Sequence, residues 1–244
     1  MTFLWRKIPP VNTVRHSMTS ALKTQIKGNI DSIQTDIDAM CDYAGVPHTK
    51  PILIAVSKVQ PTDRVKAALD VGHRIFGENR LQEAEERWHA LKPAYDGVEL
   101  HLIGGLQTNK VAKAVALFDV IQTVDRIKLA KSLAGEMEKQ NRHLPVFLQV
   151  NTGEEPQKGG CLPIDLPALV EAAVDLKLNV VGLMCIPPAN DDAALHFALL
   201  KKLAARYGYE RLSMGMSGDF ALAAAMGATD IRVGTAIFGE RDYG

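Results

Sequence analysis

The feature that most restricts the fold of this chain is a regular alternation of short apolar runs with stretches of helical period. Eight runs are predicted as strands, at residues 52–58, 74–79, 99–104, 120–124, 146–151, 180–186, 211–217 and 230–238. The segments between them are predicted as helices, because their apolar residues recur at positions that share one helix face. Eight strand–helix units in 244 residues are typical of a (β/α)₈ barrel.

The predicted fold class is α/β, a single (β/α)₈ TIM-type barrel with an extra N-terminal helix over residues 19–43. An open doubly wound sheet alternates strands and helices in the same way and stays a second possibility. Residues 61–63, Asp125 and residues 191–192 are predicted to cap the helices that follow them. Residues 1–17 are predicted as a variable N-terminal extension, and residues 18–244 as one barrel domain.

The charges of the chain argue against several classes of protein. Its 28 Lys and Arg residues equal its 28 Asp and Glu residues, so it lacks the excess of cations that nucleic-acid or anionic-membrane binding requires. No apolar run approaches the roughly 20 residues of a membrane-spanning helix. Its three cysteines have no CxxC spacing, which predicts no metal site and no disulfide framework. We therefore expect a cytoplasmic protein.

Lys58 is the first candidate for chemistry. It follows the apolar run 52–57, so an amine is expected at the carboxyl end of a buried strand, where lysine is rarely placed for packing. A desolvated, neutral amine is what Schiff-base formation with an aldehyde requires. The alternative is a lysine whose ammonium group reaches solvent at the end of the strand.

The last two predicted strands suggest a phosphate site. Small residues and hydroxyls follow them, at Ser217, Gly234 and Thr235, and loops at this place in barrels often bind phosphate. The alternative is a pair of tight turns that need glycine. If strand eight pairs with strand one, these loops lie beside Lys58. An aldehyde acceptor beside a phosphate site indicates pyridoxal 5′-phosphate (PLP), with Arg232 toward the ring nitrogen and Asn79 near the ring.

Seven motifs occur at successive strand ends of the chain. They are Ala55-Val56-Ser57-Lys58, Phe76-Gly77-Glu78-Asn79, His101-Leu102-Ile103-Gly104 with Leu106-Gln107 and Asn109-Lys110, Gln149-Val150-Asn151, Gly182-Leu183-Met184, Leu212-Ser213-Met214-Gly215-Met216-Ser217, and Val233-Gly234-Thr235-Ala236-Ile237-Phe238-Gly239. In this order they closely resemble the motifs of the YggS/PROSC family of pyridoxal phosphate homeostasis proteins, which is similar in fold to the N-terminal barrel of alanine racemase.

The resemblance implies a role for each candidate residue. Lys58 would be the Schiff-base lysine, Arg232 would lie near the pyridine nitrogen, and Asn79 and Met216 would line the cofactor. The implied phosphate ligands are Ser217, Gly234 and Thr235. The family also suggests a monomer that buffers PLP or delivers it to apo forms of PLP-dependent enzymes.

Catalysis is expected to be slight or absent. Racemisation needs a second base, which similar racemases take from an added β-domain, and no room for that domain is expected after the last strand. An arginine at the ring nitrogen would also weaken the cofactor as an electron sink. Two alternatives stay open: a weak PLP-dependent amino-acid racemase, and a regulatory module that contacts an acceptor enzyme through Glu155 and Lys158.

Four further features have less distinctive predictions. His101 and His73 are possible general bases, but packing or surface roles are favoured for both. Glu78, beside Asn79, is either a hydrogen-bond acceptor that supports the site from behind or a partner in an ion pair with Arg74 or Arg80. The glycine-containing loop 151–163 is either a rim that closes over a site or an ordinary surface loop.

Overall fold

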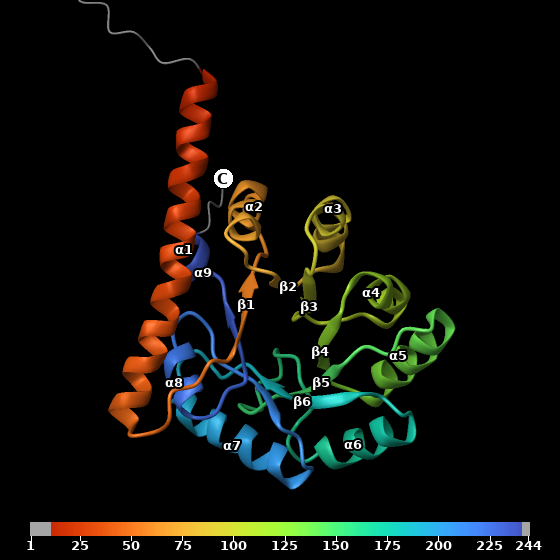
Figure 1. The fold of residues 1–244 in the computed structure, drawn as a ribbon. Helices are drawn as coiled ribbons and strands as arrows, with labels where there is room; N and C mark the ends of the chain where they lie inside the picture. Colours follow the sequence, from red (N-terminus) through yellow and green to blue (C-terminus); the bar gives the residue numbers. More distant parts are fainter. Residues whose placement is uncertain (1–10, 241–244) are drawn as a thin grey trace, which may run out of the picture.

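The eight strands of the chain form one closed parallel barrel (Figure 1). A computed structural model describes the backbone of residues 11–240 and the side chains of residues 20–240. The strands are β1 (Ile52–Val56), β2 (Ile75–Glu78), β3 (Glu99–Leu102), β4 (Val120–Val124), β5 (Val146–Val150), β6 (Val180–Cys185), β7 (Arg211–Ser213) and β8 (Asp230–Val233). Strands β1 and β8 pair in parallel, with Ile54 opposite Arg232. This pairing confirms the predicted barrel and excludes the open sheet.

Helices surround the barrel on the outside of the strands (Figure 1). They are α1 (Val11–Ala44), α2 (Thr62–Asp70), α3 (Leu81–Leu91), α4 (Val111–Leu117), α5 (Ile127–Gln140), α6 (Leu166–Asp175), α7 (Ala193–Arg206), α8 (Phe220–Ala225) and α9 (Thr235–Phe238), with short 3₁₀ turns at Lys92–Ala94 and Thr108–Lys110. Of the three predicted helix caps, only Asp192 accepts a hydrogen bond at a helix start, from the Ala194 amide at 2.9 Å. Within the described residues, no helix has the length and apolar character needed to cross a membrane.

Helix α1 is longer than predicted. It begins at Val11, so residues 11–17, which were predicted to belong to the variable extension, are helical. Residues 1–10 lie outside the described residues, and the division into an extension and a barrel domain stays a prediction. Ile26, Ile33 and Ile37 recur at helical spacing and are buried, where α1 packs along α2, α8 and α9. The Asn29 side-chain amide donates to the Ile237 carbonyl at 2.8 Å.

Strands β7 and β8 end earlier than predicted. Backbone pairing along β7 stops at Ser213, and Gly215 then adopts φ +89°, which turns the chain and is unfavourable for residues with a side chain. Strand β8 ends at Val233, because the Gly234 carbonyl accepts from the Ile237 amide at 3.0 Å and starts α9. Apolar residues continue past both strand ends, which explains why the sequence overestimated their length.

The core has two parts. A large apolar cluster lies between the strands and the helices, and a small one, with Val120, Phe147 and Met184, is separate from it. Buried polar side chains accompany these clusters, among them Gln122 and Arg232. On β8, Ile231 and Val233 belong to the large cluster, so the alternation of a strand turns Arg232 toward the inside of the barrel.

Candidate functional site

A cavity of about 300 Å³ lies at the carboxyl ends of the strands. All seven residues predicted from the sequence line it: Lys58, Asn79, Met216, Ser217, Arg232, Gly234 and Thr235. Val56, Ile103, Ile186 and Gly218 complete the lining. The structure thus brings together side chains from β1, β2, β7 and β8 with their following loops, at the end of the barrel where active sites of this architecture occur.

Lys58 lies in a turn just after β1, two residues beyond the end of the strand. The turn runs from Ser57 to Gln60, and the Gln60 amide donates to the Ser57 carbonyl at 3.1 Å. Lys58 is half-buried and lines the cavity. Val59, the next residue, adopts φ +59°, a conformation that is a genuine outlier for a β-branched side chain.

Glu78 forms a buried cluster at this turn, where it accepts hydrogen bonds. The alternative of an ion pair with Arg74 or Arg80 is wrong, because Arg80 pairs with Glu83 and Arg74 donates to backbone carbonyls. Instead Glu78 Oε1 accepts from Arg87 Nη1 at 2.7 Å, from Trp88 Nε1 at 2.9 Å and from Ser57 Oγ at 2.8 Å. Sequence reasoning missed Arg87 and Trp88, which lie within α3 and carry no motif.

Beside the end of β1, the lining of the cavity has closely approaching backbone and a hydroxyl. Ser217 Oγ accepts from the Gly234 amide at 3.3 Å and from the Ala236 amide at 3.5 Å. A Cβ atom on Gly234 would lie 3.3 Å from the Val56 carbonyl oxygen, so a larger residue would press on β1. This grouping of amides and a hydroxyl is suited to binding an anion.

Arg232 lines the cavity and is itself buried. Nη2 donates to the Cys185 carbonyl at 2.8 Å, and Nη1 donates to Ser213 Oγ at 2.6 Å. Burial lowers the pKa of Arg232 from its ordinary value, with nearby charges acting in the opposite direction. Arginine nevertheless stays protonated in proteins, so the side chain places a fixed positive charge at this point.

A chain of hydrogen bonds runs from Arg232 through the barrel. Ser213 Oγ donates to Gln122 Oε1 at 2.6 Å, Gln122 Nε2 lies 2.8 Å from His101 Nδ1, and His101 Nε2 lies 2.6 Å from Glu99 Oε1. The guanidinium of Arg232 can only donate and the carboxylate of Glu99 can only accept. Each hydrogen bond of the chain therefore runs in the direction from Arg232 to Glu99. The bond from His101 lowers the pKa of Glu99, partly offset by burial.

The other candidates lie away from the cavity. His101 does not line it and takes part in the chain below Arg232. His73 is half-buried, with Nε2 2.8 Å from the Ile75 carbonyl oxygen. The pKa of the Cys161 and Cys185 thiols is raised to about 12, with burial as the largest cause. Neither thiol is therefore a nucleophile at neutral pH.

Loop 151–163 is tied to its neighbours and contributes no residue to the cavity lining. The Asn151 amide donates to the Cys161 carbonyl at 2.8 Å, and Asn151 Nδ2 donates to the Glu155 carbonyl at 2.8 Å. Lys158 pairs with Glu155 at 2.7 Å and also donates to the Pro187 carbonyl at 3.0 Å. These bonds tie Glu155 and Lys158 to each other, to the loop backbone and to Pro187 outside the loop.

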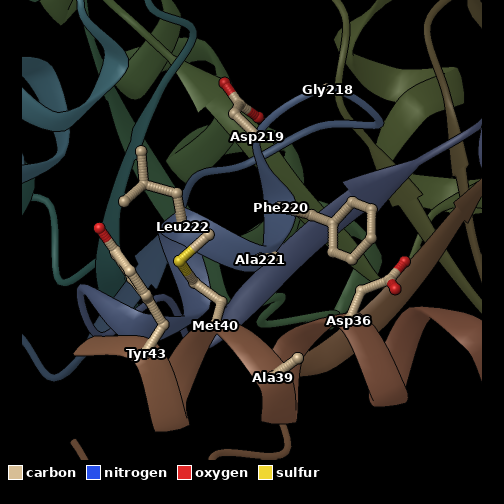
Figure 2. Close-up of a pocket in the computed structure, with 9 residues that line it drawn as sticks. All are labelled: Asp36, Ala39, Met40, Tyr43, Gly218, Asp219, Phe220, Ala221 and Leu222. Carbon is tan, nitrogen blue, oxygen red and sulfur yellow. The ribbon is translucent and has the colours of Figure 1, made fainter. Parts of the chain in front are cut away.

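A second, larger hollow lies between α1 and α8 (Figure 2). Met40 and Tyr43 from α1 face Leu222 from α8, and the Tyr43 side chain is almost fully exposed. Gly218 belongs to the lining of both hollows. The second hollow contains no residue that sequence analysis singled out for cofactor binding.

Comparisons with known proteins identify the family. Residues 29–242 match the family model described as alanine racemase, N-terminal domain. The pyridoxal phosphate homeostasis protein of Pseudomonas aeruginosa is 41% identical over 225 residues, which cover 90% of this chain and 97% of that protein. The chain belongs to the family of pyridoxal phosphate homeostasis proteins.

Solved structures of PipY and of alanine racemase share this barrel. PipY of Synechococcus elongatus PCC7942, in a structure with PLP bound, is 37% identical with a TM-score of 0.73, over 85% of this chain and all of that chain (100%). Alanine racemase from Bartonella henselae with covalently bound pyridoxal phosphate is 16% identical, with a TM-score of 0.70 over 90% of this chain and 59% of the racemase. The second likeness shows the fold alone.

Proposed function

We propose that this chain binds PLP as a Schiff base on Lys58 and holds and delivers the cofactor in intracellular PLP homeostasis, with little or no catalysis. One observation carries the proposal: the seven residues chosen from the sequence line a single cavity. Membership of the homeostasis family supports it, as does the PLP-bound structure of PipY.

The residues around the cavity fit the parts of the cofactor. Ser217, Gly234 and Thr235 would hold the phosphate, since amides and hydroxyls gather there. Lys58 would supply the amine, and Arg232 would lie near the pyridine nitrogen. The Asn79 side-chain oxygen is buried without a hydrogen-bond partner among the described residues, and a bound ligand or water commonly satisfies such an atom. When bound, PLP supplies an aldehyde that links covalently to an amine.

The lining of the cavity favours a carrier over an enzyme. Among the described residues, its titratable side chains are Lys58 and Arg232. No carboxylate, histidine, tyrosine or cysteine is present there to act as a second base. The fixed charge of Arg232 would also keep a neighbouring pyridine nitrogen unprotonated, which weakens the electron withdrawal that racemisation needs.

Further parts of the proposal concern the setting of the protein. We propose a cytoplasmic monomer whose recipients are apo forms of PLP-dependent enzymes. Light scattering during size-exclusion chromatography tests the monomer. Mixing the PLP-loaded protein with an apo-enzyme tests delivery. If delivery is direct, the activity of the apo-enzyme recovers faster than PLP dissociates from the loaded protein into solution.

Borohydride reduction tests the attachment to Lys58. The wild-type protein loaded with PLP is expected to show a near-visible absorption band that borohydride abolishes, with the cofactor then fixed on the peptide that contains Lys58. Lys58→Ala should fix none. Lys110→Ala is the matched control, because this lysine is exposed and lines a neighbouring cavity. The Lys110→Ala variant should still fix the cofactor on the peptide that contains Lys58. Loss of one enantiomer of an added amino acid would favour the racemase alternative instead.

A further inference from the structure

The turn that carries Lys58 is held in an unfavourable conformation. Lys58 is its second residue and Val59 its third, and the turn closes through the bond from the Gln60 amide to the Ser57 carbonyl. A positive φ at the third position is normally taken by Gly or Asn. Among the described residues other than glycine, four have positive φ, and only Val59 is β-branched. Such a conformation persists only when its surroundings impose it.

Arg87 contacts both ends of this turn. Its Nη1 donates to the Ser57 carbonyl at 2.7 Å, and its Nη2 donates to the Gln60 carbonyl at 2.7 Å. These two carbonyls flank Lys58 and Val59, so one rigid, planar group sets the separation and direction of the turn's ends. The side chain is 12% exposed, which limits competition by water for these bonds.

Glu78 orients the guanidinium. Its side chain is fully buried, and Oε1 accepts from Arg87 Nη1 and from the Ser57 hydroxyl. Trp88, on the same helix as Arg87, donates to the same oxygen. A buried carboxylate with these donors holds Arg87 against the turn and balances its charge. The side chains of Glu78, Arg87 and Trp88 do not line the cavity.

We propose that Arg87, oriented by Glu78, is a positioning residue that imposes the strained turn and thereby places the Lys58 amine for attachment of the cofactor. This inference rests on the proposed function, since it concerns how Lys58 meets PLP. Without Arg87 the peptide between Lys58 and Val59 is free to rotate so that Val59 leaves the positive-φ region. The amine then occupies the productive position for a smaller fraction of the time.

The test compares Arg87→Met with a matched arginine variant. Arg142→Met is the control, because Arg142 also bonds backbone carbonyls, those of Val115, Ala116 and Phe118, away from the cavity. The rate of Lys58 attachment to PLP is followed by absorbance. We expect Arg87→Met to attach PLP about tenfold more slowly, given that a misplacement of about 1 Å can cost about a hundredfold. Arg142→Met should keep the wild-type rate.

A second substitution separates positioning from general structural support. Glycine adopts positive φ freely, so adding Val59→Gly to Arg87→Met removes the strain that Arg87 was opposing. We expect this double variant to recover most of the rate. If Arg87→Met attaches PLP at the wild-type rate, or if Val59→Gly does not raise the reduced rate, the inference is overturned.

A measurement without cofactor keeps the inference independent of the proposed function. Hydrogen exchange of the Gln60 amide in the cofactor-free protein reports closure of the turn; Arg87→Met should speed it and Val59→Gly should reverse the change. Unchanged exchange would overturn the inference. If the wild-type protein forms no link to PLP, the proposed function fails, and this exchange still decides the role of Arg87. Should Arg87→Met not fold, Arg87→Lys is measured instead, with the same direction expected.

Discussion

Replacing Gln122 by leucine tests the hydrogen-bond chain beneath Arg232. Gln122 is fully buried on β4 and is the central member of that chain, joined to His101 Nδ1 and to Ser213 Oγ. Gln122→Leu nearly conserves volume but leaves the Ser213 hydroxyl hydrogen without its acceptor and His101 Nδ1 without its donor. Each orphaned group costs about 1–3 kcal/mol, so the free energy of unfolding should fall by about 2–6 kcal/mol.

Urea unfolding monitored by tryptophan fluorescence measures this loss. Gln140→Leu is the control, since Gln140 bonds the Ala112 carbonyl and Glu136 at the surface of α5 and its loss should cost under about 1 kcal/mol. Adding Ser213→Ala to Gln122→Leu should cost less than the two changes made separately, because it removes one orphaned group. A loss for Gln122→Leu no larger than that of Gln140→Leu would refute the reasoning.

Two further predictions concern close packing and pH. Gly104→Ala places a Cβ 2.1 Å from the Asn79 carbonyl oxygen, and Gly182→Ala places one 2.1 Å from the Arg211 carbonyl oxygen, so each should lower the free energy of unfolding by about 1–3 kcal/mol. Only Gly104→Ala should also weaken PLP binding, and equal PLP affinities of the two variants in equilibrium titrations would contradict this. Burial lowers the pKa of His73 in the folded protein, so as pH falls the unfolded chain takes up a proton at His73 before the folded protein does. The stability contributed by neutral His73 is therefore lost as pH falls below about 6.5. The difference in unfolding free energy between wild type and His73→Gln should narrow from pH 7 to pH 5, and a constant difference would count against this prediction.

The residues that line the cavity could be predicted because the architecture itself brings them together. Parallel strands in a barrel end at one rim, so Lys58 after β1 and Arg232 on β8 meet once those two strands pair. Order along the chain and strand periodicity carry that information. The same reasoning located Ser217 and Gly234, which follow the neighbouring strands.

The support behind these residues could not be predicted in the same way. Arg87 is one of several charged residues in α3, and nothing in helical period distinguishes it from those that face solvent. The bond between Gln122 and Ser213 crosses the barrel, and it depends on side-chain conformations that sequence spacing does not encode. The ion pair considered for Glu78 was with arginines close in sequence, whereas its partner Arg87 lies nine residues away, within α3.

Closure of the barrel through β1 and β8 has a consequence for synthesis of the protein. The cavity joins Lys58, just after the first strand, to Arg232 and Gly234, on and after the last strand. Helix α1 spans the same seam through Asn29 and Ile237. Contacts so distant in sequence form late, and at about 5–20 residues per second a ribosome needs on the order of ten seconds or more to make the intervening chain. In a nascent chain Lys58 is therefore made long before the cavity that it lines is complete, and the proposed cofactor site exists only once the last strand has docked.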